Sequence, residues 1–348
     1  MDGTMKKAVI SGVKQAQLVE MPIPRPRETW ALVKMTVVPM CTEYKAWLSG
    51  PGERGQIPAL GHEGVGEVVE VAQPCGVKVG DRVVLMGAGP CGRCVYCRAG
   101  NFLHCQNQTS YTAFTGEREP TGAYAQYRLG ADWLLPKIPD DIPDDLAAMA
   151  WCGLGPTFGA MQTAQVDAFD TVLVTGAGPV GQGAIINAKF RGARVIVTEI
   201  EPWRMARATS LGADAVVDGR ATDAAAQVKA LTDGGLGVTC AIDCAGTTAS
   251  QRVCIDAARP KGRVCFVGEN NEPLPIVVSP DLLRKGLTLI GQWHYSLNDF
   301  DRIMQVIRAS QEKLGLLISH RFPMSRVQEA LALSASHQCG KIILDPWA

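Results

Sequence analysis

Residues 91–105 read CGRCVYCRAGNFLHC and contain four cysteines in the pattern C-x2-C-x2-C-x7-C, namely Cys91, Cys94, Cys97 and Cys105. A two-residue gap lets one tight turn bring two thiolates to the same metal ion, and a structural zinc site is usually closed by four such ligands. The residues between the cysteines are mostly polar or small, so the loop cannot build an apolar core. A disulfide pair or free thiols are the alternative, but nothing marks the chain as secreted. The loop needs a cross-link, and the spacing predicts that a metal ion such as zinc provides it.

A second set of metal-binding side chains is spread over three separate segments. Cys41 ends a strand-like run, and His62 and Glu63 lie in the segment GHEGVG, whose glycines let the backbone approach whatever the imidazole contacts. Cys152 lies in a stretch that reads as a helix over residues 140–161. Taken alone, His62 is also compatible with a polar residue satisfied within a turn, and Cys152 with a buried core thiol. Both alternatives stay open at this point.

The segment DTVLVTGAGPVG, residues 170–181, joins a buried strand to an apolar helix through a glycine-rich turn. This is the context that the dinucleotide-binding fingerprint G-x-G-x-x-G requires. Gly176 makes the tight turn, Gly178 lets the backbone meet a pyrophosphate, and Gly181 lets helix and strand pack closely. The helix N-terminus then faces the phosphates with its positive dipole end. The cofactor-facing residues of this turn are Gly176, Gly178, Pro179, Val180 and Gly181.

The next predicted strand, ARVIVTE, ends in Glu199, roughly twenty residues after the glycine-rich turn. A carboxylate at this place binds both ribose hydroxyls and repels a 2′-phosphate, so the sequence favours NAD over NADP. Arg204 nearby argues the other way, because an arginine can pair with that phosphate. Near the end of the chain, Lys341 is a candidate contact for a cofactor phosphate, and a solvated lysine is the alternative.

The elements that position these residues differ between the two halves of the chain. The first half contains short runs rich in β-branched residues, such as KKAVISG and WALVKMTVV, separated by glycine and proline, and predicts a small, mostly antiparallel barrel. The later runs GAYAQYRLG and WLLPKIP, the second at residues 133–139, read as further strands. The second half alternates strands and helices, which predicts an α/β, doubly wound parallel sheet. Ligands bind beyond the carboxyl ends of such strands, and this places Ala245, Gly246, Val267 and Gly268 near the cofactor.

The length of 348 residues suggests two domains. We expect residues 1–153 and 292–348 to form the barrel domain and residues 154–291 the dinucleotide-binding domain. The 34 basic and 34 acidic residues balance, so no basic surface suggests a nucleic-acid partner. The N-terminus lacks the apolar core of a signal peptide, and no apolar run approaches the roughly 20 residues of a membrane span. The other cysteines lie in apolar surroundings typical of reduced thiols, which favours a cytoplasmic protein.

Cys41, the GHEGVG box, the four-cysteine loop, Cys152, VTGAGPVG and the closing GKIILD occur in an order that resembles the zinc-dependent medium-chain alcohol and polyol dehydrogenases. The resemblance is to the sorbitol and threonine dehydrogenase branch. It implies a Rossmann domain joined to a mostly β, GroES-like catalytic domain. It also implies two zinc ions per chain, one in the loop and a catalytic one held by Cys41, His62 and Cys152, with Glu63 as a neighbouring or alternating ligand.

The same resemblance implies a reaction. A hydride would pass between NAD and a secondary alcohol, such as a polyol or sugar derivative, with the ketone as the other reactant. The zinc would lower the pKa of the substrate hydroxyl and the cofactor would take the hydride. Enzymes of this family are commonly homodimers or homotetramers, and we expect the same here.

Two positions depart from the family pattern. A Gly-(Ser/Thr)-Asp run is usual after the first zinc cysteine, but this chain has Thr42-Glu43-Tyr44. Either Thr42 supplies the hydroxyl of the proton relay or Glu43 takes its place. The polyol branch usually has glutamate where this chain has Cys152, so a primary-alcohol dehydrogenase remains a second candidate. The altered segment keeps a third candidate open, a non-catalytic NAD-binding redox sensor.

Aromatic residues are candidates for the substrate pocket. They could equally be ordinary core or interface residues, and the sequence does not decide between these roles. The four candidates are Tyr44, Trp47, Phe114 and Trp293.

Overall fold

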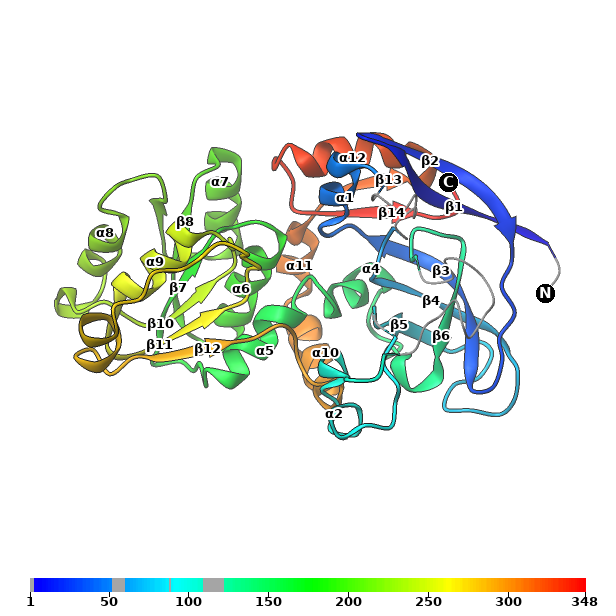
Figure 1. Ribbon diagram of the computed structural model, residues 1–348, viewed down its shortest axis with the longest axis horizontal. Coiled ribbons are helices and arrows are strands. Elements are labelled where there is room, and N and C mark those ends of the chain that lie inside the picture. The colour runs from blue at the N-terminus through cyan, green and yellow to red at the C-terminus, as the bar shows by residue number, and fades with distance from the viewer. Residues whose placement is uncertain (1–2, 52–59, 88, 109–121) are drawn as a thin grey trace. The chain divides into compact units, whose positions relative to one another are not determined.

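The computed structural model describes residues 3–51, 60–87, 89–108 and 122–348, which form two compact units (Figure 1). The first unit comprises Met1–Cys152, Ser296–Ile307 and Ile318–Ala348, and the second comprises Gly153–Tyr295 and Arg308–Leu317. Among the described residues, no helix is both long and apolar enough to cross a membrane.

The first unit is built on a six-stranded sheet in which β3 pairs antiparallel with β4, β6 and β14. The path through the sheet is β13-β14-β3-β4-β5, and β1 and β2 form a separate antiparallel hairpin. This confirms the expected mostly β architecture. The strands are β1 (Thr4–Gly12), β2 (Gln15–Pro22), β3 (Trp30–Pro39), β4 (Gly64–Val71), β5 (Arg82–Leu85), β6 (Tyr127–Ala131), β13 (Ile318–Pro323) and β14 (Lys341–Asp345).

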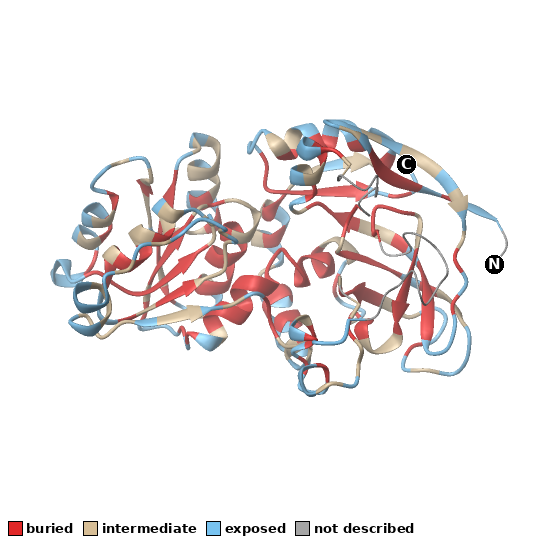
Figure 2. Cartoon of the chain, in the orientation of Figure 1, coloured by how far each residue is buried: buried red, intermediate tan, exposed pale blue. Residues whose placement is uncertain are grey.

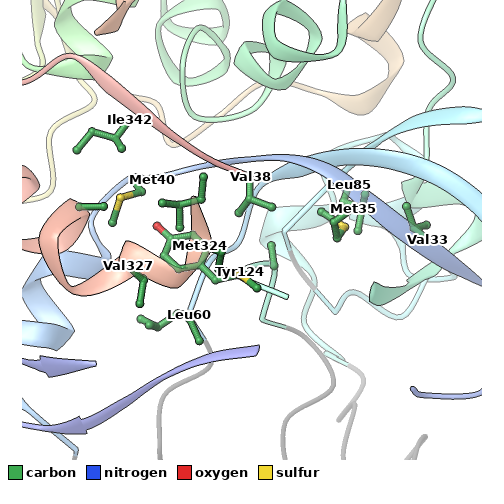
Figure 3. Close-up of a cluster of buried hydrophobic side chains, with 14 of the residues drawn as sticks. Val33, Met35, Val38, Met40, Leu60, Leu85, Tyr124, Met324, Val327 and Ile342 are labelled. Atoms are coloured by element: carbon green, nitrogen blue, oxygen red, sulfur yellow. The ribbon is translucent and has the colours of Figure 1, made fainter. Parts of the chain in front are cut away.

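The core of the first unit joins segments from both ends of the chain (Figure 3). Val33 and Met35 of β3 belong to the same buried cluster as Tyr124, Met324 and Val327. Burial of these side chains removes apolar surface from water and so fixes the C-terminal segment to the N-terminal strands. The helices of this unit are α1 (Glu43–Ser49), α2 (Val95–Arg98), α4 (Asp144–Ala147), α10 (Phe300–Ala309), which extends beyond Ile307, and α12 (Val327–Ala335).

The second unit is a parallel six-stranded sheet in the order β12-β11-β10-β7-β8-β9. Its central strands are buried, whereas α7 and α8 expose their outer faces (Figure 2). Parallel strands buried on both faces read as apolar runs, which explains why this half was recognisable from sequence. The elements are α5 (Gly155–Thr163), β7 (Thr171–Thr175), α6 (Pro179–Phe190), β8 (Arg194–Glu199), α7 (Pro202–Leu211), β9 (Ala215–Asp218), α8 (Ala224–Ala230), β10 (Val238–Asp243), α9 (Thr248–Ala257), β11 (Ala258–Phe266), β12 (Thr288–Gly291) and α11 (Gln311–Leu317).

Three sequence expectations differ from the structure. The run 133–139 is not a regular strand, because it starts in a 3-10 turn and contributes only an isolated bridge between Lys137 and Val83. The expected helix over 140–161 is broken into α4, a 3-10 turn (Ala148–Ala150) and α5, and Cys152 lies in the break. Residues 308–317 belong to the second unit because α11 packs on α6 and α7, where Lys313 Nζ donates to the Ser210 carbonyl.

Candidate active site

The described residues contain two groups of side chains able to hold a metal ion, both in the first unit. In the four-cysteine loop, α2 begins directly after Cys94, so that one helical turn brings the Cys97 sulfur to 3.4 Å from the Cys94 sulfur. The backbone N–H of Cys97 lowers the pKa of Cys94 to about 6, which favours the thiolate that zinc requires. The four sulfurs belong to Cys91, Cys94, Cys97 and Cys105, and all lie within 4.8 Å of one another.

The sulfur atoms of this loop are also hydrogen-bonded by the backbone. Cys105 Sγ accepts from the N–H groups of Cys91 and Asn107 at 3.3 and 3.4 Å. All four cysteines are free thiols rather than disulfide partners. With four sulfurs converging, the group fits a closed zinc site and leaves no ligand position for a substrate.

The second group consists of Cys41, His62, Glu63 and Cys152, whose ligand atoms also lie within 4.8 Å of one another. Cys41 lies between β3 and α1, the His-Glu pair immediately precedes β4, and Cys152 lies in the turn before α5. The Nε2 atom of His62 is 3.1 Å from Cys152 Sγ. A nitrogen about 2.0 Å and a sulfur about 2.3 Å from one tetrahedral zinc ion lie roughly 3.5 Å apart, so these two atoms are close enough to share one ion. The structure thus brings together all four residues predicted around the catalytic zinc.

The electrostatics of this group also suit a cation. The hydrogen bond from Cys152 and the charge of Lys341 hold the pKa of the Cys41 thiol well below its usual range, against the effect of burial. The same hydrogen bond, together with burial, raises the pKa of Cys152. Burial raises the pKa of Glu63 to about 7, and the charge of Lys341 offsets only part of this effect. A divalent cation would stabilise these anionic groups together.

The Glu43 carboxylate contacts the His62 ring at Nδ1 and fixes the orientation of the ring. One carboxylate oxygen is 2.8 Å from His62 Nδ1, and the other accepts hydrogen bonds from the Cys41 N–H at 2.7 Å and the Tyr124 hydroxyl at 2.9 Å. Although burial alone would raise it, the hydrogen bond and charge of His62 lower the pKa of Glu43 to about 2. A carboxylate at Nδ1 fixes the tautomer and leaves Nε2 for the metal. Glu43 is therefore engaged with the ligands rather than presented to a substrate.

Tyr124 is a site residue that the sequence did not reveal. Its side chain is fully buried and packs against Gly61, where a Cβ atom would overlap the tyrosine ring. Gly61 also adopts a positive φ of 83°, which glycine tolerates best. No local signal in the run GAYAQYRLG distinguishes this tyrosine from a core aromatic, because its partner Glu43 is 81 residues away.

Lys341 is not available to a cofactor phosphate, which corrects the sequence expectation. Its Nζ forms an ion pair with Glu63 and donates to the Met40 carbonyl at 3.1 Å, and both charged side chains are completely buried. The other Glu63 oxygen accepts from the Cys152 N–H at 3.2 Å. The physical reason is strand pairing, because Met40 N–H donates to the Ile342 carbonyl and so carries Lys341 alongside the metal ligands.

The remaining pocket candidates have different surroundings. Thr42 is exposed at the N-terminus of α1, and its side chain makes no capping hydrogen bond. Trp47 is a core residue whose Nε1 donates to Gln328 at 3.1 Å. Tyr44 meets the His337 ring edge-on, and Trp293 of the second unit is 52% exposed. Phe114 lies outside the described residues.

The predicted dinucleotide turn lies at the carboxyl end of β7 in the second unit. Gly176 has a φ of 80°, Gly178 precedes the first turn of α6, and a Cβ at Gly181 would overlap the Gly176 carbonyl oxygen. These features meet the three demands of the fingerprint. Pro179 and Val180 form the first turn of α6.

Glu199, at the end of β8, accepts hydrogen bonds from backbone N–H groups at both carboxylate oxygens. The donors are Ala177 of the glycine-rich turn at 2.6 Å and Ile200 and Glu201 at 2.7 and 3.0 Å. The carboxylate therefore also braces the turn from the neighbouring strand. The guanidinium of Arg204 lies 3.5 Å from the point where a Cβ on Gly178 would stand. Ala245, Val267 and Gly268 follow β10 and β11 at the same edge of the sheet.

Comparisons with known proteins agree with both units. Residues 179–309 match the family described as zinc-binding dehydrogenase, and residues 27–140 match the alcohol dehydrogenase GroES-like domain. An uncharacterised zinc-type alcohol dehydrogenase-like protein of Escherichia coli K12 is 32% identical over 98% of this chain and 99% of its own length. The erythritol/L-threitol dehydrogenase of Mycolicibacterium smegmatis is 30% identical over 95% and 94%. The crystal structure of benzyl alcohol dehydrogenase from Acinetobacter calcoaceticus is similar with a TM-score of 0.87 at 25% identity, covering 99% of each chain.

Proposed function

The chain belongs to the zinc-containing medium-chain alcohol dehydrogenase family, and from this premise we propose that it transfers a hydride between NAD and a secondary alcohol of the polyol or sugar-derivative class. The observation that carries the proposal is the convergence of Cys41, His62 and Cys152 in a chain with a complete dinucleotide turn. The similarity to an erythritol/L-threitol dehydrogenase supports the polyol class.

Zinc at this site would act as a Lewis acid toward the substrate hydroxyl, while NAD would accept the hydride. The chain's own residues then have separate tasks. Glu43 orients His62, and Lys341 holds Glu63 beside the cluster. Since both oxygens of Glu43 are engaged, we assign the proton relay to the exposed hydroxyl of Thr42, next to Cys41.

We assign NAD rather than NADP as the cofactor. The support is Glu199, whose carboxylate at the end of β8 would repel a 2′-phosphate. Arg204 stands near Gly178, on the pyrophosphate side of the turn, and is proposed to contact the cofactor there. Ala245, Val267 and Gly268 complete the proposed cofactor-facing edge.

We propose a cytoplasmic homodimer or homotetramer as the working form. The support for this compartment is chemical, because both cysteine clusters require reduced thiolates to bind zinc and all twelve cysteines are free thiols. The support for the assembly is the family resemblance alone.

The test is a substrate screen on the zinc-loaded full-length chain, followed by the absorbance of NADH. We expect a higher kcat/KM for at least one tetritol, hexitol or other secondary alcohol than for ethanol or benzyl alcohol, and weaker turnover with NADP. The proposal is contradicted if no alcohol in a broad panel reduces NAD.

A primary-alcohol dehydrogenase is the second candidate, and Cys152 favours it because the polyol branch usually has glutamate there. The similarity to benzyl alcohol dehydrogenase agrees with this reading. The same screen separates the two, since a primary-alcohol enzyme would prefer benzyl alcohol or ethanol to every polyol. A non-catalytic redox sensor is disfavoured, because the relatives are enzymes and the catalytic ligand set is complete.

A further inference from the structure

Asp243, the last residue of β10, has a completely buried carboxylate that accepts five hydrogen bonds. None of the donors in these bonds is a charged side chain, so only neutral hydrogen-bond donors stabilise the buried carboxylate at this edge of the sheet. The donors are the Thr175 and Ser250 hydroxyls at 2.8 Å, the Gln251 side-chain amide at 3.2 Å, and the backbone N–H groups of Ala245 and Gly246 at 3.3 Å.

The carboxylate and the backbone carbonyl of Asp243 together contact all three turns that we expect to face the dinucleotide. Thr175 directly precedes Gly176 of the glycine-rich turn, and Ala245 belongs to the turn after β10. The backbone carbonyl of Asp243 completes the set, because it accepts from the N–H groups of Val267 and Gly268 after β11, at 3.0 and 2.9 Å. One residue therefore connects the carboxyl ends of β7, β10 and β11.

The turns themselves fit closely against one another. A Cβ atom at Gly176 would stand 2.8 Å from the Ala245 Cβ, and one at Gly268 would overlap the backbone of Gly246. Since backbone meets backbone here, no flexible side chain can absorb a shift of one turn. A change at Asp243 therefore moves all three turns together.

We infer that Asp243 is a positioning residue for the dinucleotide, holding the turns after β7, β10 and β11 in the arrangement that binds it. This inference rests on the proposed function, which supplies NAD as the ligand. Asp243 itself is buried beneath the turns and acts through them rather than by touching the cofactor.

The chemistry of the carboxylate makes the inference testable with a substitution of equal size. In Asp243→Asn, an NH2 group replaces one of the two carboxylate oxygens. That NH2 group then faces the N–H of Ala245 if it replaces Oδ1, or the N–H of Gly246 if it replaces Oδ2. The Thr175 and Ser250 hydroxyls can reverse their role and accept, but a backbone N–H cannot. Whichever way the amide lies, the turn after β10 therefore loses one acceptor and faces a donor instead.

Asp170 provides a matched control in the same sheet. It is also a buried aspartate, but it precedes β7 at the opposite end of the sheet and pairs with Arg263. Asp170→Asn should lower the free energy of unfolding without disturbing the cofactor turns. A merely structural role for Asp243 would make the two variants behave alike.

The experiment measures NADH affinity by fluorescence on the full-length zinc-loaded chain, together with KM for NAD and kcat at saturating NAD. For Asp243→Asn we expect the Kd of NADH and the KM for NAD to rise roughly tenfold, with kcat nearly unchanged, while Asp170→Asn changes Kd less than about twofold. Unchanged affinity in Asp243→Asn, or an equal loss in both variants, would overturn the inference.

A second pair of variants protects the test against misfolding of Asp243→Asn. Thr175→Val removes one donor to the carboxylate, whereas Thr175→Ser keeps it. We expect Thr175→Val to weaken NADH binding and Thr175→Ser to restore it, and equal affinities in the pair would contradict the inference. Failure of the proposed function is distinguishable, because the wild-type chain would then reduce no NAD with any alcohol, whereas the comparison of NADH affinities tests the role of Asp243 by itself.

Discussion

Three donors meet on the carboxylate of Glu43, and this arrangement explains how an atypical sequence keeps a histidine ligand in place. His62, the Cys41 N–H and the Tyr124 hydroxyl come from three segments of the first unit. A buried carboxylate with this many partners is held in one geometry, and it holds the imidazole in turn. Glu43 was one of two alternatives for the proton relay, and because both of its oxygens have partners we propose that it orients His62 instead.

Replacing Glu43 by glutamine keeps the size of the side chain but replaces one carboxylate oxygen with an NH2 group, which donates hydrogen bonds instead of accepting them. One of its partners then loses its acceptor, so His62 is held less firmly. We expect Glu43→Gln to weaken zinc binding at the Cys41 site by roughly 10- to 100-fold, while the four-cysteine loop keeps its zinc. Zinc release to a chelator measures this as one fast and one unchanged phase.

Tyr124→Phe is the control for this substitution, because it removes only the hydroxyl donor and leaves the ring packed on Gly61. Its effect on zinc release should be smaller than that of Glu43→Gln. Two zinc ions released from Glu43→Gln at the wild-type rates would show that Glu43 does not support the site.

At the scale of elements, the glycine-rich turn depends on the close approach of α6 to β7. Gly181 lies where a side chain would overlap the Gly176 carbonyl oxygen, so the helix begins against the strand with no space between them. Glu199 then ties this turn to β8 through Ala177. The positive end of the α6 dipole is thereby held at the sheet edge.

A methyl group at Gly181 must therefore displace backbone. We expect Gly181→Ala to lower the free energy of unfolding by roughly 1–3 kcal/mol and to weaken NADH binding. At Gly315, within α11, a Cβ atom would meet no heavy atom within 4 Å, so Gly315→Ala should instead raise stability by roughly 0.5–1 kcal/mol. Urea unfolding measures the free energy of unfolding of both variants, and NADH fluorescence measures their affinity for NADH. Equal changes in stability and affinity in the two variants would contradict this explanation of the turn.

The elements that the sequence predicted well are those with a local signal. The apolar strands of the second unit and the glycine turn were readable because periodicity and turn chemistry are local. The helix expected over 140–161 was wrong, because continuous apolar character does not show the break that places Cys152. The strand expected over 133–139 was wrong for a similar reason, since an apolar run does not reveal whether it finds a pairing partner.

At the scale of the whole molecule, the site residues that sequence reasoning missed or misplaced all depend on pairings between distant segments. Lys341 reaches Glu63, 278 residues away, because β14 pairs with β3. Tyr124 meets Glu43 through the core that closes the first unit. The metal ligands themselves were predictable because cysteine and histidine are typical zinc ligands and occur along this chain in the same order as in the family. A lysine or a tyrosine, by contrast, is common at many kinds of site.

The two metal clusters of the first unit have separate roles. The four-cysteine loop is closed by sulfur and has no position for a substrate, so it serves structure. The Cys41 cluster combines sulfur, imidazole and a nearby carboxylate, so it serves chemistry. These roles predict that one cluster can be emptied without unfolding the chain.

The most direct test is the zinc content of Cys41→Ser, measured with its NAD-reducing activity and its melting temperature. We predict one zinc ion per chain instead of two, no activity, and a folded protein, whereas Cys75→Ser, outside both clusters, keeps two zinc ions and full activity. A Cys41→Ser protein that retains two zinc ions and wild-type activity would contradict the assignment of the catalytic site.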